Sequence, residues 1–244
     1  MRMVLLLACA FCLRAADTDR DGLSDRLEEQ LLKQFRPQLL IDAQDCDGRP
    51  AEFARGKVLR PGAKNGTLYG QVFRAGAFIE IHYYHLWTND CGLRGHALDA
   101  EHVAVLLEPK GRSWRALAWI AAGHEGTVCD RRHGALAAAL GAVDRGATIW
   151  VSRGKHASFL SQAACGGGCG ADRCDRPLTL TPGKLLNIGE AQRPYPGYEW
   201  IRLRAGRFDL SSKMSSEFGE ADLAVMRKKG ALTSLTLLGR LSGF

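Results

Sequence analysis

The residues with the strongest chemical character lie between Asp90 and His102, and they are carboxylates and imidazoles. His96, Asp99 and Glu101 stand at the spacing H-x-x-D-x-E, with Asp90 shortly before them. If the chain is extended from Asp99 onward, the side chains of Asp99 and Glu101 point to the same side. Hard carboxylate oxygens beside an imidazole are ligands for a divalent cation, chiefly calcium, magnesium or manganese. The alternative is that these are polar loop residues that hydrogen-bond to the backbone.

A second group of carboxylates follows the first sixteen residues and has the spacing of a calcium loop. Counting from position one, carboxylates fall at positions one, three, five, nine and twelve and a backbone carbonyl at seven: Asp17, Asp19, Asp21, Asp25, Glu28 and the carbonyl of Leu23. Gly22 permits the sharp turn at position six, as in an EF-hand. Ser24 replaces the apolar residue of an EF-hand pair and no helix precedes the loop, so it resembles the single-helix calcium loops of dockerin and thrombospondin-type repeats. The alternative is an acidic helix start, which capping and the helix dipole also favour.

Two apolar-rich segments, 77–87 and 103–107, predict buried strands on either side of the first polar group. We therefore expect that group to form a short polar loop between them. Residues 67–73 and 77–87 predict one hairpin, and 101–108 with 114–122 predict a second. Because side chains alternate along a strand, His82 and His85 fall on opposite faces of the 77–87 strand.

The remaining segments complete a mainly β pattern with no internal repeat. Apolar residues at helical spacing predict an amphipathic helix over 23–35 that ends before Pro37. The other expected elements are helices at 133–143 and 221–229 and strands at 38–41, 147–152, 184–188 and 231–238. Many short strands with Gly and Pro turns predict a two-sheet β-sandwich decorated with peripheral α-helices. The expected organisation is a leader at 1–16, a calcium loop with its helix at 17–36, and a β-sandwich domain at 37–244.

The N-terminus has the pattern of a secretory signal peptide. A positive start is followed by an apolar run over 3–13 and by Ala15 and Ala16 at the cleavage site. The apolar run is too short to span a bilayer. A lipoprotein reading remains open because Leu6, Leu7 and Ala8 precede Cys9. Either reading predicts a secreted or periplasmic protein.

The cysteines that remain after removal of the leader are even in number, which favours disulfides in an exported chain. They are Cys46, Cys91, Cys129, Cys165, Cys169 and Cys174. The sequence does not select among their possible pairings. The cluster at 165–174 could instead suggest a zinc site, but it offers three thiols and no close fourth ligand.

The formal net charge of +7 permits attraction to anionic surfaces without requiring it. No nucleic-acid-binding motif is present, and the sequence leaves the oligomeric state open. Ser158 lacks the G-x-S-x-G context of a serine hydrolase, and no phosphate loop or dinucleotide fingerprint occurs.

Residues 95–105 read GHALDAEHVAV and resemble the G-H-R-H-D-W-E region of the necrosis- and ethylene-inducing peptide-like proteins. They also resemble the G-D-W-E-H-V segment of vacuolar-sorting-like bacterial and fungal proteins. The likeness covers about 78–161. Ala97, Leu98 and Ala100 stand where the first motif has arginine, histidine and tryptophan. These departures argue against retention of the toxin activity.

The resemblance implies a two-sheet β-sandwich with a divalent cation, calcium or magnesium, held near one end. The implied ligands are Asp90, His96, Asp99, Glu101 and, from a segment similar to the H-A-S-Y of the relatives, His156. The implied partners are membrane lipid headgroups or glycans that contact the metal face. Two other functions stay open: a metal-dependent extracellular hydrolase in which Glu101 or His156 activates water, and a structural or adhesive module stabilised by calcium and disulfides.

Overall fold

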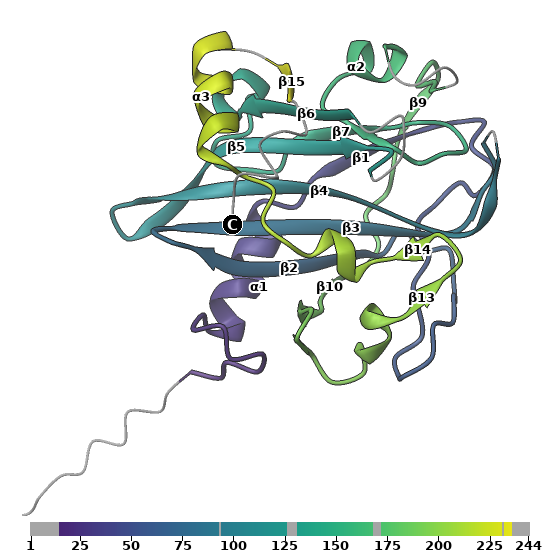
Figure 1. The fold of residues 1–244 in the computed structure, drawn as a ribbon, viewed down its shortest axis with the longest axis horizontal. Coiled ribbons are helices and arrows are strands. Elements are labelled where there is room, and N and C mark those ends of the chain that lie inside the picture. Colours follow the sequence, from purple (N-terminus) through teal and green to yellow (C-terminus); the bar gives the residue numbers. More distant parts are fainter. Residues whose placement is uncertain (1–14, 93, 126–130, 168–171, 231, 236–244) are drawn as a thin grey trace, which may run out of the picture.

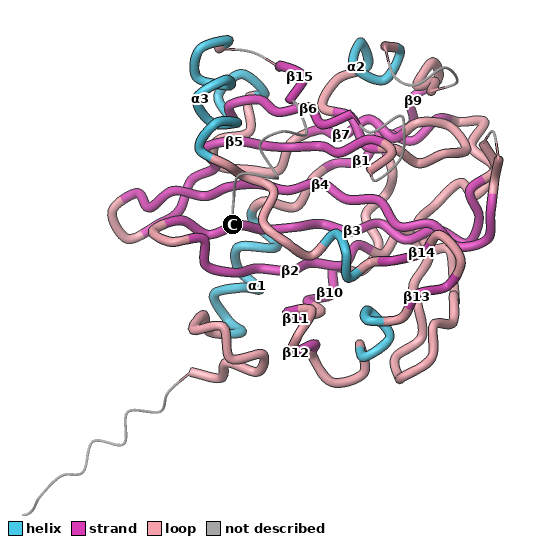
Figure 2. The backbone as a smooth tube through the Cα atoms, in the orientation of Figure 1, coloured by secondary structure: helices cyan, strands magenta, loops and turns pink. Residues whose placement is uncertain are grey.

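The computed structural model describes residues 15–92, 94–125, 131–167, 172–230 and 232–235. Two β-sheets pack against each other, and short helices lie around them (Figures 1 and 2). The predicted mainly β sandwich with peripheral helices is therefore confirmed.

The larger sheet has seven strands in the order β10-β2-β3-β4-β5-β6-β15. Their bounds are β2 Leu68–Ala75, β3 Phe78–Asp90, β4 His96–Lys110, β5 Ser113–Gly123, β6 Arg131–Leu136, β10 Leu185–Asn187 and β15 Thr233–Leu235. Both predicted hairpins, β2–β3 and β4–β5, are present and antiparallel. The edge strand β10 pairs with β2 in parallel, which fits a strand that arrives from a distant part of the chain.

The smaller sheet has four strands in the order β8-β7-β1-β9. Their bounds are β1 Gln38–Asp42, β7 Thr148–Val151, β8 Ser158–Phe159 and β9 Pro177–Thr179. Two short ribbons lie outside both sheets: β11 Gly189–Glu190 with β12 Arg193–Pro194, and β13 Arg204–Ala205 with β14 Phe208–Asp209. The parallel pairing of β1 with β7 joins the N-terminal region to the middle of the chain.

The amphipathic helix is confirmed as α1, Asp25–Gln34. Its N-cap Ser24 accepts a hydrogen bond from Leu27 N, which satisfies one of the free donors of the first turn. Leu32 is buried against β2 at Gly70, where a Cβ would lie only 2.2 Å from Leu32 Cδ2. Gly70 therefore provides the close approach that seats α1 on the sandwich.

The other helices are short, and among the described residues none could cross a membrane. They are α2 Gln162–Gly166, α3 Glu220–Lys229 and the 3-10 turns η1 Ala137–Leu140, η2 Glu199–Arg202 and η3 Ser211–Lys213. The prediction of a helix at 221–229 is confirmed.

The prediction of a helix at 133–143 is wrong, because this segment forms the end of β6 followed by η1. Alanine has the highest helix propensity, but propensity is a weak determinant, and antiparallel pairing of β6 with β5, such as Ala121 with His133, overrides it. The polar loop expected between β3 and β4 is also much shorter than predicted. Asp99 and Glu101 lie within β4, opposite Trp87 and His85 of β3.

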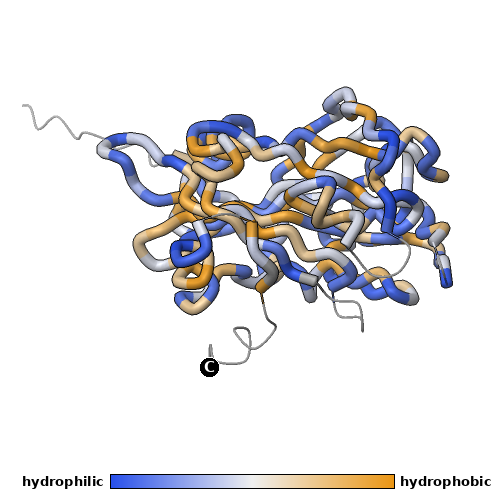
Figure 3. Tube along the Cα trace, turned by 90° about the horizontal axis from the view of Figure 1, so that it is seen from above, coloured by the Kyte–Doolittle hydropathy of each residue, from blue (hydrophilic) through white to orange (hydrophobic). Residues whose placement is uncertain are grey.

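Both faces of the larger sheet are buried. Ile81, Tyr83 and Val105 belong to the core between the two sheets, whereas Tyr84 packs with Trp200 on the opposite face. We call this opposite face the outer face. Hydrophobic residues run along the packed strands, and hydrophilic residues dominate the outer loops (Figure 3). Because both faces are covered, every residue of β3 from Ile79 to Trp87 is buried, including Glu80, His82 and His85.

Candidate functional site

The N-terminal loop brings three carboxylates together beside the start of α1. Asp17, Asp19 and Asp21 each place one ligand atom within 4.8 Å of the others. Asp19 is only 2% exposed, and neither of its oxygens has a hydrogen-bond partner. One oxygen of Asp17 and one of Asp21 are also buried without a partner. Buried carboxylates are costly unless a cation or donors compensate them, so this loop has the chemistry of a cation site.

Two glutamates approach the loop from other elements. Glu28 of α1 is fully buried, and its Oε2 accepts from Tyr195 Oη at 2.7 Å and Asn187 Nδ2 at 2.8 Å, which leaves Oε1 without a partner. Glu190 of β11 also has a buried, unpartnered Oε1. Burial raises the pKa of both glutamates, and repulsion from Asp19 adds to this rise.

The pKa values in this cluster reflect burial first and mutual repulsion second. Burial raises the pKa of Glu28 to about 8, and burial together with Asp21 raises that of Asp19 to about 7. Asp25, the predicted ligand at position nine, accepts from Thr18 N at 2.8 Å and Thr18 Oγ1 at 2.7 Å, and its role as a ligand stays a prediction. Asp25 therefore closes the loop. The amide of Leu23 donates to Asp21 Oδ1 at 2.7 Å. The role of the Leu23 carbonyl as a ligand stays a prediction.

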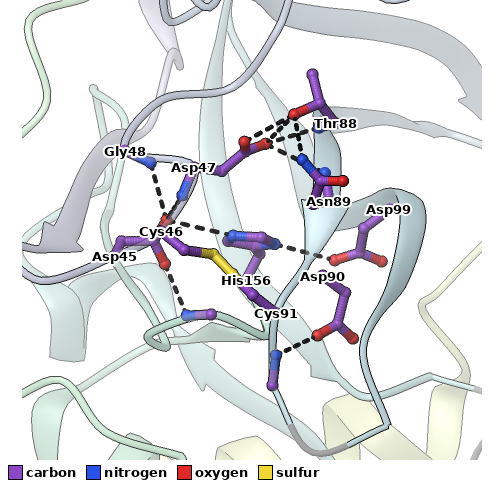
Figure 4. The surroundings of a disulfide bond; sticks show 12 residues. Asp45, Cys46, Asp47, Gly48, Thr88, Asn89, Asp90, Cys91, Asp99 and His156 are labelled. Carbon is purple, nitrogen blue, oxygen red and sulfur yellow. Dashed lines mark hydrogen bonds and ion pairs between the residues drawn. A yellow bond between two sulfur atoms is a disulfide. The ribbon is translucent and has the colours of Figure 1, made fainter.

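At one end of the sandwich, the His156 side chain lies between two carboxylates (Figure 4). Its Nδ1 is 3.2 Å from Asp99 Oδ2, and its Nε2 is 3.4 Å from Asp45 Oδ1. Burial lowers the pKa of His156, but hydrogen bonds and attraction from Asp45 and Asp99 outweigh burial and raise it to about 9. His156 and Asp99 therefore meet as the sequence predicts. Asp45 was not predicted, since it follows β1 in a turn without a recognisable motif.

Asp90 and His96 face each other at the tip between β3 and β4, with His96 Nε2 3.4 Å from Asp90 Oδ2. Asp90 Oδ1 also accepts from Gly92 N at 2.7 Å. Glu101 is buried farther along β4, and its Oε2 has no hydrogen-bond partner.

The five predicted metal ligands thus form two histidine–carboxylate pairs, with Glu101 apart from both. Within the described part of the chain, no three of them gather their ligand atoms within 4.8 Å. A shared divalent-cation site at Asp90, His96, Asp99, Glu101 and His156 stays a prediction.

Ser158 forms a close pair with His85, but the histidine cannot act as its base. His85 Nε2 lies 2.8 Å from Ser158 Oγ, and Trp87 Nε1 donates to His85 Nδ1 at 2.8 Å. The indole donor leaves Nδ1 without a proton, so Nε2 carries the proton and donates it to Ser158. Burial, followed by the charge of His156, lowers the pKa of His85 to about 3. This arrangement agrees with the absence of a serine-hydrolase motif.

A third cluster lies on the outer face, around His102 of β4. His102 Nδ1 is 3.4 Å from Glu125 Oε2, and His102 Nε2 is 3.4 Å from Glu217 Oε1. Arg132 is 3.2 Å from Glu217, and Lys213 is 3.2 Å from Glu125. Sequence reasoning assigned no role to these residues, because they are far apart in the chain and carry no common motif.

Two disulfides are present among the described residues. Cys46–Cys91 ties the turn that carries Asp45 to the β3–β4 tip, with a Cα–Cα distance of 6.6 Å (Figure 4). Cys165–Cys174 spans the start of the glycine-rich loop. The predicted disulfide cysteines Cys129 and Cys169 lie outside the described residues. Because Cys165 and Cys174 pair with each other, neither offers a thiolate to zinc.

No family model matches the chain, and neither does any curated protein. Solved structures do match. NLPPya in complex with mannosamine is 15% identical with a TM-score of 0.47, over 80% of this chain and 88% of that one. A structure described as a toxin fold for microbial attack and plant defense is 15% identical with a TM-score of 0.49, over 79% and 90%.

Necrosis and Ethylene inducing Protein 2, from the causal agent of cocoa's witches' broom disease, is 18% identical with a TM-score of 0.43, over 71% of this chain and 80% of that one. These structures belong to the family that residues 95–105 resemble, so the resemblance is confirmed. At these identities and TM-scores, the similarity does not assign a ligand to this chain.

Proposed function

We propose that the protein is an exported β-sandwich that binds a divalent cation, and that its N-terminal loop holds one structural calcium ion. This proposal rests on a set of buried carboxylate oxygens that have no hydrogen-bond donor. They are Asp17 Oδ1, both oxygens of Asp19, Asp21 Oδ2, Glu28 Oε1 and Glu190 Oε1. Calcium accepts six to eight oxygens in flexible geometry, whereas magnesium keeps much of its water. This donor-rich loop therefore suits calcium better.

The bound ion would fasten the N-terminal region to the sandwich. The loop continues into α1, which packs on β2, and Tyr195 hydrogen-bonds to both Asp25 and Glu28. Without a cation, burial and, to a lesser extent, mutual repulsion disfavour ionisation and raise the pKa values of Asp19 and Glu28. Calcium would remove this repulsion, so binding and folding of the loop should be coupled.

Calcium titration calorimetry on the full chain tests the proposal. We expect one site in the wild type and loss of that site in Asp19→Asn. The matched control is Glu29→Gln, an exposed carboxylate on α1 that pairs with Lys33 and should leave binding unchanged. A wild type that takes up no calcium, or an Asp19→Asn variant that binds it equally well, contradicts the proposal.

A second candidate function is contact with sugars or lipid headgroups at the β3–β4 tip. The observation that favours it is the polar, half-buried pair of Asp90 and His96 at this end, beside Lys155, whose side chain lies against Gly92. Such groups can bind hydroxyls or a phosphate. Flotation with anionic and neutral liposomes, and titration with an amino sugar such as mannosamine, test this contact. If Asp90→Ala and His96→Ala leave the binding unchanged, the proposed contact at the tip is contradicted.

For the metal-dependent hydrolase alternative, both candidate bases are enclosed: each ring nitrogen of His156 faces a carboxylate, and Glu101 is buried. A serine hydrolase is not favoured either, because the Ser158–His85 pair has the wrong tautomer for proton abstraction and both side chains are fully buried. The structural-module alternative shares the calcium loop with our proposal. It differs only in predicting no ligand at the tip.

A further inference from the structure

The turn after β1 and the tip between β3 and β4 meet at the buried imidazole of His156 (Figure 4). One ligand atom from each of Asp45, Cys46 and His156 lies within 4.8 Å of the other two. His156 Nε2 lies 3.4 Å from Asp45 Oδ1 and is buried without a hydrogen-bond partner. Thiolate sulfur, carboxylate oxygen and imidazole nitrogen are the ligands that zinc takes in proteins. The sulfur of Cys46 is bonded to Cys91 in this structure, so the thiolate appears only on reduction.

The ring of His156 is oriented as a metal-binding histidine is. Its Nδ1 lies 3.2 Å from Asp99 Oδ2, and the ring stacks on the indole of Trp87 with centroids 3.9 Å apart. A histidine that binds a metal commonly donates its other ring N–H to a carboxylate, which fixes the ring and leaves the second nitrogen for the ion. Asp99 and Trp87 therefore aim Nε2 of His156 at Asp45.

Main-chain contacts hold this end of the sandwich together in addition to the disulfide. Cys91 N donates to Gly154 O at 2.8 Å, and Gly154 N donates to Asp45 Oδ2 at 2.7 Å. Asp47 Oδ2 accepts from Thr88 N at 2.7 Å, which ties the turn to β3. The donor atoms should therefore stay close to one another when the disulfide is reduced. Both of its cysteines are exposed, so a reductant can reach them.

We propose that the Cys46–Cys91 pair exchanges its disulfide for a zinc ion when it is reduced. A dithiol reductant supplies two electrons and two protons, becomes a disulfide itself, and leaves two cysteine thiols on the chain. Zn²⁺ then replaces both thiol protons and the proton on His156 Nε2, and these protons pass to water. The reduced chain holds the ion through Cys46 Sγ, Cys91 Sγ, His156 Nε2 and a carboxylate oxygen of Asp45.

The ligand set selects zinc over the cation of the N-terminal loop. Two thiolates, one imidazole and one carboxylate oxygen complete a tetrahedral zinc site. Calcium and magnesium prefer oxygen ligands, so they should not compete for it. The inference is therefore independent of the calcium loop. In the reduced chain, the ion would fasten the turn after β1 to the β3–β4 tip, as the disulfide does in the oxidised chain.

Alkylation of individual cysteines tests the inference on the full chain. The protein is reduced with a phosphine, which brings no thiol to compete for the ion, and is treated with iodoacetamide at increasing Zn²⁺. Peptide mass spectrometry reports Cys46 and Cys91 separately from the other cysteines. We expect Zn²⁺ to protect both residues from alkylation and calcium to protect neither.

Three variants separate a built site from binding by the thiols alone. His156→Phe keeps an aromatic ring on Trp87 but removes a ligand, so half-protection should need much more Zn²⁺. Asp99→Asn keeps all four ligands and should raise the half-protecting concentration about 10–100-fold, because Asp99 acts only through the ring of His156. The matched control is Asp144→Asn, which removes an exposed carboxylate between η1 and β7 and should change nothing.

Equal alkylation of the reduced wild type with and without Zn²⁺ overturns the inference, whatever the variants do. Protection that a folded His156→Phe variant leaves unchanged also overturns it, because the thiols alone would then hold the ion. Circular dichroism shows whether each variant folds. If His156→Phe does not fold, Asp99→Asn decides by the same measurement, and an unchanged half-protecting concentration contradicts the site. The calcium-loop proposal is unaffected by any of these results.

Discussion

The imidazole of His156 lies flat on the indole of Trp87, with ring centroids 3.9 Å apart and planes 7° from parallel. Asp45 and Asp99 flank the same imidazole at its two nitrogens. An aromatic face and two carboxylates all favour a charged ring, and together they outweigh its burial. The sandwich end is thus built around a buried imidazolium.

Stability should therefore fall in mildly alkaline solution. The folded pKa of His156, about 9, lies above the ordinary value of about 6.5. The stabilisation is fully present below pH ~6.5 and is lost as the pH rises through about 9. The size of the loss is on the order of 3 kcal/mol in the free energy of unfolding. Urea denaturation at several pH values between 6 and 10, with calcium in excess, measures it.

His156→Phe is the control for this prediction. Phenylalanine can keep the stack on Trp87 but carries no charge, so its stability should change much less across the same pH range. Equal slopes for the wild type and His156→Phe would show that the imidazolium does not stabilise the fold.

The effect of Asp19→Asn on the free energy of unfolding should change sign when calcium is added. In chelator, the variant should be more stable than the wild type, because a neutral amide replaces a carboxylate whose pKa burial and Asp21 raise to about 7. With calcium a hundredfold above its dissociation constant, the wild type gains about 2.7 kcal/mol, which the variant lacks. Thermal unfolding with and without calcium measures both effects. A variant that is less stable in chelator as well speaks against repulsion in the empty loop.

Arg132→Met should be among the most destabilising single changes on the outer face. Arg132 is buried, and it lies 3.2 Å from both Glu217 and Asp222. Removal of one partner from a buried ion pair costs about 3–5 kcal/mol. Urea denaturation measures the loss, with the exposed Arg227→Met of α3 as a control that should remain within about 0.5 kcal/mol of the wild type. A loss below about 1 kcal/mol for Arg132→Met would contradict this role.

Ser158 should not react with a fluorophosphonate probe. The indole of Trp87 fixes the proton of His85 on the nitrogen that faces Ser158, so no base is available to activate the hydroxyl. Mass spectrometry of the treated, folded protein checks this outcome. Labelling of Ser158 at a rate above that of other serines would show that a base does activate its hydroxyl.

Local patterns predicted the elements whose own residues determine them. Apolar-rich runs separated by short turns indicated the β2–β3 and β4–β5 hairpins, and apolar residues at helical spacing indicated α1. The prediction of a helix in the alanine-rich segment at 133–143 failed because the conformation of this segment depends on pairing with β5.

Site residues were predictable where their neighbours lie close in the sequence, and were missed where only tertiary packing brings them together. The Asp17–Asp19–Asp21 cluster is local, so its spacing alone indicated it. His156 was paired with Asp99 through a family resemblance. In contrast, Asp45, Glu190 and Lys213 reach their clusters only through tertiary packing, and no spacing in the sequence marks them.

Counting the calcium ions on the chain tests the central claim most directly. Equilibrium dialysis against radioactive calcium at pH 7.5, on the wild type and Asp19→Asn, gives the stoichiometry without any assumption about activity. We predict one ion per wild-type chain and none on the variant. No ion on the wild type, or one that persists in Asp19→Asn, would contradict the assignment of the N-terminal loop as the calcium site.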